Sequence, residues 1–122
     1  MLSEIDRRAI RRVIERQLEA FGRDDADAAF AFASPAIQAQ FESPSRFIAM
    51  VRSSYAPVYR PRSILFQDIV AIEGYPAQKL TLMDANGDLF TAFYVMEPQR
   101  DGRWRIQGCF LMPLEAIHPD ED

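Results

Sequence analysis

The chain has 122 residues, a formal net charge of −4, one cysteine and one histidine. A chain of this length fits one domain and can bury roughly two-thirds of its unfolded surface without a disulfide or a metal ion. The negative charge argues against a nucleic-acid partner or an anionic membrane, and no apolar run is long enough to span a bilayer. Cys109 and His118 make a poor metal-ligand set, so we expect no metal and no cofactor.

The sequence favours a cytoplasmic location. Residues 1–6 carry acidic side chains and no apolar core, which predicts that there is no signal peptide. Because Cys109 is the only cysteine, it cannot form an intramolecular disulfide, in keeping with a reducing compartment. Thirteen arginines against one lysine suggest a GC-rich coding sequence, and hence a bacterial source.

The N-terminal half of the chain predicts three helices. The first runs from about Ile5 to Phe21 after an N-cap at Ser3, because apolar residues lie along one arc and charged residues along the opposite arc. The second covers residues 26–33. The third begins at Ser43-Pro44, where a serine N-cap precedes a proline in the first turn.

Two further segments of this half are predicted to be shorter. Ser34-Pro35 repeats the serine–proline signal and opens a short turn through Phe41. The stretch from Pro57 to Pro61 is predicted to be an extended entry to the first strand, because proline disfavours the helical conformation in the residue before it.

After Tyr55 the pattern changes to the alternation typical of β-strands. Four segments rich in β-branched and aromatic residues follow one another, at residues 63–72, 77–84, 88–97 and 103–112. Asn86-Gly87 and Asp101-Gly102 are strong signals for short hairpins between them. We therefore predict an α+β fold with three helices packed on a four-stranded antiparallel sheet. We expect one domain over residues 1–122, with an ordered core of about 3–114.

The hairpin turns also predict which side chains share a face of the sheet. Loops with an even number of residues pair Tyr94 with Cys109 and Leu80 with Phe93. One face is then almost wholly apolar and is assigned to the helices: Gln78, Leu80, Leu82, Leu89, Thr91, Phe93, Val95, Trp104, Ile106 and Phe110. A loop of three or five residues at either turn would reverse this assignment.

The opposite face is more apolar than a solvated face should be. We therefore expect the protein to form a homodimer through this face. The candidate dimer residues are Phe90, Tyr94, Met96, Gln107, Cys109 and Leu111.

The final hairpin, Asp101-Gly102-Arg103-Trp104-Arg105-Ile106, resembles the ending common in the nuclear-transport-factor-2-like superfamily. A narrower set of motifs resembles an uncharacterised, mainly bacterial family of unknown function within it: Phe41-Glu42-Ser43-Pro44, Phe47, Met50-Val51, Tyr55, Pro57-Val58-Tyr59-Arg60-Pro61 and Gly108-Cys109. The resemblance implies a cone-shaped fold that dimerises through the sheet and encloses a pocket between the helices and the concave sheet face. Some superfamily members are isomerases or dehydratases, and many are noncatalytic. No catalytic motif transfers to this chain.

Six polar residues are candidates for lining such a pocket. Gln17 lies in the apolar arc of the first helix, where its amide either faces a ligand or binds a backbone group in the core. Tyr55 and Tyr59 lie where the helices meet the sheet, and their hydroxyl groups either orient a ligand or reach the surface. Gln78 and Thr91 are the polar residues of the face assigned to the helices.

Asp68 is the sixth candidate, because it shares strand parity with apolar residues. If that face is interior, burial would raise the pKa of the carboxyl group and suit it to act as a general base. The alternative is a bulge or an edge position that returns Asp68 to water.

Three functions therefore remain open from the sequence. The first is a homodimeric module that binds a small molecule in the pocket. The second is an isomerase- or dehydratase-like enzyme that uses Asp68 as its base. The third is a noncatalytic interaction domain in which Phe30, Phe32 and Phe66 fill the cone.

Overall fold

The computed structural model describes residues 2–114 and confirms an α+β fold in which helices precede a curved antiparallel sheet. The helices are α1 (Glu4–Gly22), α2 (Ala26–Ala31), α3 (Pro35–Phe41), α4 (Pro44–Ser54) and α5 (Ala56–Tyr59). The strands are β1 (Ser63–Ile72), β2 (Tyr75–Met83), β3 (Leu89–Pro98) and β4 (Trp104–Pro113), and they pair in chain order. His118 lies outside the described residues.

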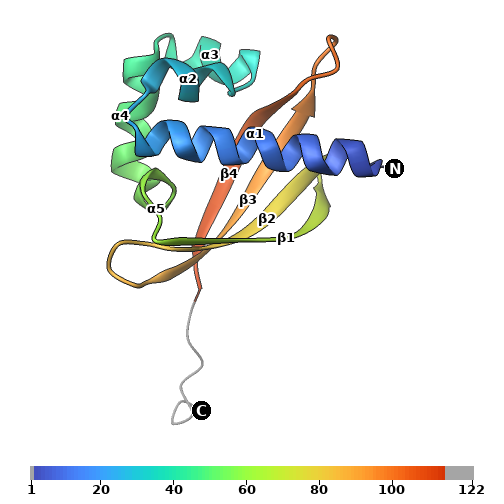
Figure 1. Cartoon of the computed structure of the whole chain (residues 1–122). Coiled ribbons are helices and arrows are strands. Elements are labelled where there is room, and N and C mark those ends of the chain that lie inside the picture. The colour runs from blue at the N-terminus through green and yellow to red at the C-terminus, as the bar shows by residue number, and fades with distance from the viewer. Residues whose placement is uncertain (1, 115–122) are drawn as a thin grey trace.

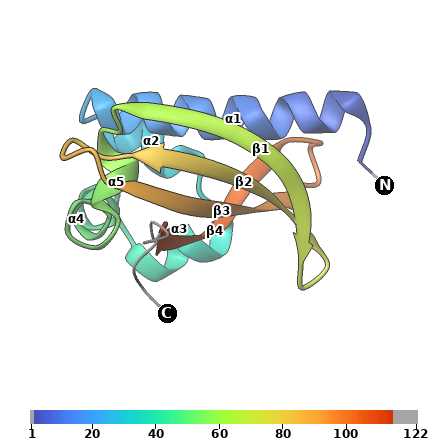
Figure 2. The same ribbon diagram turned by 90° about the horizontal axis from the view of Figure 1, so that it is seen from below.

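The layers of the fold place the helices on one side of the sheet. α1 crosses in front of the strands, and α2, α3 and α4 gather above its C-terminal end (Figure 1). Viewed from below, the sheet is strongly curved and β1 arches beside α1 (Figure 2). The space between the helices and the concave side of the sheet is therefore where a pocket can form.

Serine residues cap the three longest helices at the positions that the sequence predicts. The Ser3 hydroxyl accepts a hydrogen bond from the Asp6 amide at 3.0 Å, and the Asp6 carboxylate accepts one from the Ser3 amide at 3.1 Å. The pKa of Asp6 is lowered, mainly because the hydrogen bond from the Ser3 amide favours the charged carboxylate. Ser34 caps α3 and Ser43 caps α4 in the same way.

Two short helices replace the turn and the extended segment that the sequence predicts. The turn through Phe41 is the helix α3, and residues 56–59 form α5 instead of an extended entry to β1. Pro57 lies in the first turn of α5, where its missing N–H costs no helical hydrogen bond. The Val58 amide donates a hydrogen bond to the Tyr55 carbonyl at 3.0 Å. This bond connects the end of α4 to α5.

The predicted pairing of the last two strands is confirmed, whereas that of the middle two is wrong by one residue. Tyr94 pairs with Cys109 as expected, although the loop between Pro98 and Trp104 has five residues, because the extra residue Gln107 in β4 restores the register. Leu80, however, pairs with Ala92 instead of Phe93, because five residues separate the last pair, Met83 and Leu89. The Asp84 carboxylate stabilises this longer loop, since one of its oxygens accepts hydrogen bonds from two backbone amides at 2.9 Å each.

This odd loop length exchanges the two faces of β3 relative to β2. The expected dimer residues Phe90, Tyr94, Met96, Cys109 and Leu111 share the face that the helices cover, and their assignment to the outer face is wrong. Tyr94 is 2% exposed and Met96 is fully buried. Gln107 lies at a bulge in β4, with its amide oxygen buried and unpaired among the described residues.

The outer face of the sheet mixes polar residues with several exposed hydrophobic side chains. It carries residues that the sequence assigns to the helix side, among them Leu89, Thr91, Phe93 and Phe110. Phe110 is 55% exposed, and the same face also exposes Met112 on β4 and, at the opposite edge of the sheet, Leu65 and Val70 on β1. A partner could therefore cover this face.

Candidate functional site

A cavity of about 230 Å³ lies between the helices and the strands β3 and β4. Its walls come from α1, the segment after α2, and the helices α3, α4 and α5 together with β3 and β4. The lining residues are Gln17, Phe21, Ala33, Ile37, Gln40, Phe41, Phe47, Met50, Val51, Tyr55, Val58, Tyr94, Ile106, Gly108 and Cys109. The lining is mostly apolar, and none of its side chains is ionised at neutral pH.

Aromatic packing around Phe47 holds this wall of helices together. The Phe47 ring lies 5.5 Å from the ring of Phe30 in α2, 5.8 Å from that of Phe41 in α3 and 6.2 Å from that of Phe21 in α1. These separations are typical of favourable aromatic pairs. One phenylalanine of α4 therefore fixes three other helices around the cavity.

Gln17 makes a hydrogen bond to a backbone group in the core, which was one of the two predicted roles, and it also lies at the cavity wall. The side chain is 3% exposed, and its amide nitrogen donates to the Ala29 carbonyl at 3.1 Å, at the end of α2. Gln17 also lines the cavity. The helix-to-helix hydrogen bond satisfies the buried donor and fixes the amide at the cavity wall.

Tyr94 and Cys109 form the sheet side of the cavity. They pair across β3 and β4, and the Tyr94 hydroxyl is buried with no hydrogen-bond partner among residues 2–114. Burial raises the pKa of Tyr94 well above its ordinary value, and it raises the pKa of the Cys109 thiol to about 12. Both groups therefore remain protonated at neutral pH, and Cys109 is a weak nucleophile.

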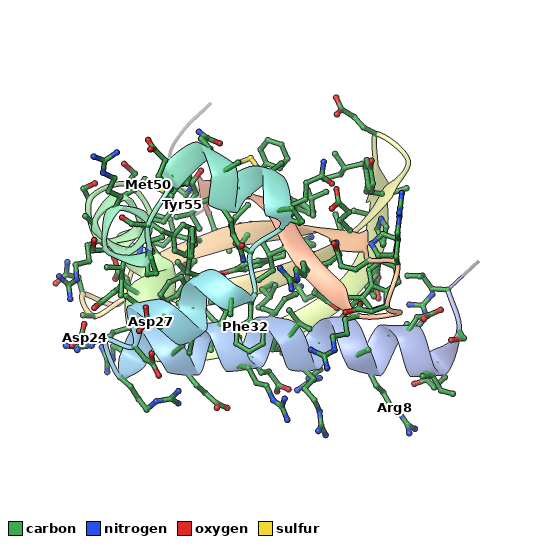
Figure 3. All side chains as sticks on the ribbon, turned by 90° about the horizontal axis from the view of Figure 1, so that it is seen from above. Arg8, Asp24, Asp27, Phe32, Met50 and Tyr55 are labelled. Atoms are coloured by element: carbon green, nitrogen blue, oxygen red, sulfur yellow. The ribbon has the colours of Figure 1, made fainter. Side chains whose placement is uncertain are left out.

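The two candidate tyrosines separate in the structure. Tyr55 lines the cavity, whereas Tyr59 lies outside it. The Tyr59 hydroxyl accepts a hydrogen bond from the Arg52 guanidinium at 3.0 Å, at the surface. Figure 3 shows Tyr55 beside Met50 at the α4 end of the molecule, while Arg8 points away from it on the far part of α1.

Arg52 and Arg60 hold Tyr59 in a charged cluster outside the cavity. Both guanidinium groups lie over the Tyr59 ring, and both bind the Asp24 carboxylate, at 2.8 and 2.6 Å. The hydrogen bond from Arg52 and the positive charge of both groups lower the pKa of Asp24. Through these contacts the cluster joins the α1–α2 turn to α5.

Asp68 lies on the surface, in agreement with the alternative that a bulge or an edge position returns it to water. β1 bulges between Phe66 and Ile69, which turns Asp68 to solvent. No residue of β1 lines the cavity. An acid–base role for Asp68 in this cavity therefore has no geometric support.

Gln78 and Thr91 also lie away from the cavity. Gln78 is buried, and its amide nitrogen donates to the Gln67 carbonyl at 2.6 Å and to the Lys79 carbonyl at 2.9 Å, which holds the bulge of β1. Thr91 pairs with Thr81 on the outer face. The structure thus brings Gln17 and Tyr55 together at the cavity and places the other four candidates elsewhere.

Tyr94 and Cys109 were not predicted to line the cavity, because the predicted pairing placed them on the opposite face of the sheet. Asp84 is the residue in the sequence that could have indicated the correct face. An aspartate two residues before Asn86-Gly87 favours a side-chain-capped loop over a two-residue hairpin turn. Such a loop reverses the parity and turns Tyr94 inward.

The described residues contain no group of three or more side chains that could hold a metal ion. Within residues 2–114, no helix combines the length and the apolar character needed to cross a membrane.

No match to the chain was found among curated proteins or among solved structures. Residues 3–118 match the family described as "Domain of unknown function (DUF4864)". The match extends from the α1 cap past the end of β4 and so covers the whole cavity. The chain therefore belongs to the DUF4864 family.

Proposed function

We propose that this domain is a homodimeric small-molecule-binding module with the cone-shaped fold of the nuclear-transport-factor-2-like superfamily. Its ligand occupies the cavity between the helices and the concave face of the sheet. The observation that carries the proposal is the cavity of about 230 Å³ itself, whose walls are mostly apolar and include the polar side chains of Gln17, Gln40 and Tyr55. Apolar walls with a few polar groups are typical of small-molecule sites.

The position of the large aromatic side chains supports an open cavity over a filled one. None of Phe30, Phe32 and Phe66 lines the cavity. Phe30 packs on Phe47 in the helix cluster, and the Phe66 ring lies 4.4 Å from the Arg11 guanidinium at the α1–β1 groove. None of the three rings that could have filled the cone therefore closes the cavity, and two of them make contacts elsewhere.

The outer face of the sheet supports the homodimer part of the proposal. Four strands of about ten residues cover roughly 600 Å² in projection, so two stacked copies would bury on the order of 1,200 Å². That area is at the lower end of the range for stable, specific interfaces. A second copy is the partner proposed because an isologous interface needs only one self-complementary apolar surface.

The test of the pocket is native mass spectrometry of freshly purified protein and of a variant with a filled cavity. Met50 lines the cavity, whereas its neighbour Ala49 on α4 is exposed and does not. We expect the unaltered protein to carry a small, reproducible adduct, Met50→Trp to lose it and Ala49→Trp to keep it. An adduct that survives in Met50→Trp would place the ligand outside the cavity and contradict the proposal.

A further inference from the structure

We propose that a bulge in β1 keeps the free edge of the sheet from pairing with a strand of another copy of this chain. The bulge lies between Phe66 and Ile69, where Gln67 and Asp68 together stand opposite the single residue Lys79 of β2. A bulge of this kind interrupts the ladder of hydrogen bonds and increases the local twist. The device is separate from the cavity and from the proposed dimer through the outer face of the sheet.

Of the two edge strands, β1 and β4, only β4 is paired on its outer side within residues 2–114. The segment after α2 binds β4 through two hydrogen bonds. The Ser34 amide donates to the Ile106 carbonyl, and the Ile106 amide donates to the Phe32 carbonyl, each at 2.8 Å. In the same part of the chain, β1 has one strand neighbour, β2. Unpaired backbone groups along such an edge can bind a strand of another chain.

The composition of β1 makes its free edge prone to pairing. Leu65 is 60% exposed, and Ile64 and Val70 are each 40% exposed. Asp68 is the one charged residue of the strand Ser63–Ile72. Apolar, β-branched segments of about six or seven residues with little charge readily stack with copies of themselves. An uninterrupted β1 would therefore be long enough to form such a pairing.

Hydrogen bonds from β2 hold the bulge in its position. Gln78 is buried, and its amide nitrogen donates to the Gln67 carbonyl at 2.6 Å. The Thr81 hydroxyl donates to the side-chain oxygen of Gln67 at 2.8 Å. Straightening β1 would leave the buried Gln78 amide without one of its two acceptors, and unpaired buried polar groups are costly. The extra residue of β1 is therefore fixed by side chains of the neighbouring strand.

The bulge shortens the free edge and places a charge at its centre. It divides β1 into two regular stretches of four residues, 63–66 and 69–72. If two copies of β1 paired antiparallel over their whole length, the two bulges would meet and the two Asp68 carboxylates would lie side by side. Like charges that oppose each other across strands are destabilising. A shifted register would avoid this contact but would pair no more than one stretch of four residues without interruption.

Deletion of Asp68 tests the bulge most directly. It removes the charge and leaves Gln67 alone opposite Lys79, so the other residues of β1 keep the faces that they have. Sedimentation velocity over a concentration series measures association, and hydrogen–deuterium exchange measures the protection of the β1 amides. We expect the deletion variant to form larger species than the unaltered protein at the same concentration. In these species the β1 amides should exchange about tenfold more slowly than in the unaltered protein.

Two substitutions keep the test decisive if the deletion prevents folding. Asp68 is exposed, so Asp68→Val keeps the fold while it removes the charge from the free edge. We expect Asp68→Val to associate through β1, though more weakly than the deletion variant. Asp27→Val, at an exposed position of α2, should associate no more than the unaltered protein.

Cooperative unfolding in urea identifies which variants are folded. A folded deletion variant that forms no larger species would overturn the role of the bulge. If the deletion variant does not fold, the absence of larger species in Asp68→Val would overturn it instead. Larger species in which the β1 amides stay unprotected, or equal association of Asp27→Val, would also contradict the proposal.

Discussion

Both faces of the sheet carry large hydrophobic side chains, yet they differ in what covers them. The inner face lies under the helices, and Leu80, Leu82 and Met96 on it are fully buried. On the outer face, Leu65 is 60% exposed and Phe110 is 55% exposed. Hydrophobic side chains alone therefore do not identify the inner face of this sheet. The pairing of β2 with β3 decides which residues the helices cover, and that pairing depends on one loop.

The largest difference between the faces should appear in stability. Leu80→Ala removes a fully buried side chain and leaves a cavity, so we expect it to lower the free energy of unfolding by about 3 kcal/mol. Leu65→Ala, on the outer face, should cost about 1 kcal/mol or less. Urea denaturation measures both values. Equal losses of stability in the two variants would contradict the assignment of Leu80 to the covered face and Leu65 to the exposed face.

The next effect concerns association through the outer face. Phe110→Arg places a charge in the proposed interface, and a two-fold interface contains two copies of it, so we expect dimer affinity to fall about a hundredfold. Ile5→Arg is the matched control, because Ile5 is 78% exposed but lies on α1. Sedimentation velocity over a concentration series measures the affinity. Equal effects of the two substitutions would contradict an interface on the outer face.

The inner face should also respond to high pH. In the unfolded chain, the Cys109 thiol ionises near its ordinary pKa of 9.0, whereas burial raises its pKa to about 12 in the folded domain. Above pH 9 the unfolded chain therefore releases a proton that the folded domain retains. Stability should fall as pH rises from 9 toward 12, by up to about 1.4 kcal/mol per pH unit.

Cys109→Ala tests this assignment. The variant removes the thiol, so its free energy of unfolding should change less between pH 8 and 10 than that of the unaltered protein. Urea denaturation at a series of pH values measures both slopes. Identical slopes would show that another group is responsible.

The smallest expected effect concerns the β2–β3 loop, whose length decides which side chains of β3 face the helices. Asp84→Ala removes the acceptor of two backbone hydrogen bonds, so we expect a loss of about 1 kcal/mol in stability. Asp88→Ala, in the same loop, is the control, because only the Asp88 backbone takes part in these bonds. Thermal unfolding compares the two. A larger loss in Asp88→Ala would contradict the capping role of Asp84.

Local signals in the sequence were sufficient for the fold class, the strand order and the helix caps. Both hairpin loops have five residues instead of the even number expected. At Asp101-Gly102 the extra residue Gln107 in β4 restores the register, so Tyr94 still pairs with Cys109. At Asn86-Gly87 no bulge compensates for the loop that Asp84 caps, so the predicted pairing is wrong by one residue. A change of one residue reverses every side chain of a strand relative to its neighbour, so an error in one loop moved all of β3.

Prediction of the cavity residues was limited by the same error and by tertiary contacts. Gln17 was identified because a polar residue interrupted an apolar helix arc, and Tyr55 because it lies where α4 ends. Tyr94 was assigned to the wrong face. The exposure of Asp68 depends on a bulge that Gln78 holds from the neighbouring strand, a contact that strand periodicity does not contain.

The central claim is that the inner face holds a ligand and the outer face joins a second copy, independently of each other. Native mass spectrometry of undialysed protein, compared with Phe110→Arg, tests both parts at once. We predict a dimer with one small adduct per protomer for the unaltered protein, and a monomer that keeps the adduct for Phe110→Arg. A clean monomer from the unaltered protein, or loss of the adduct together with the dimer, would contradict the account.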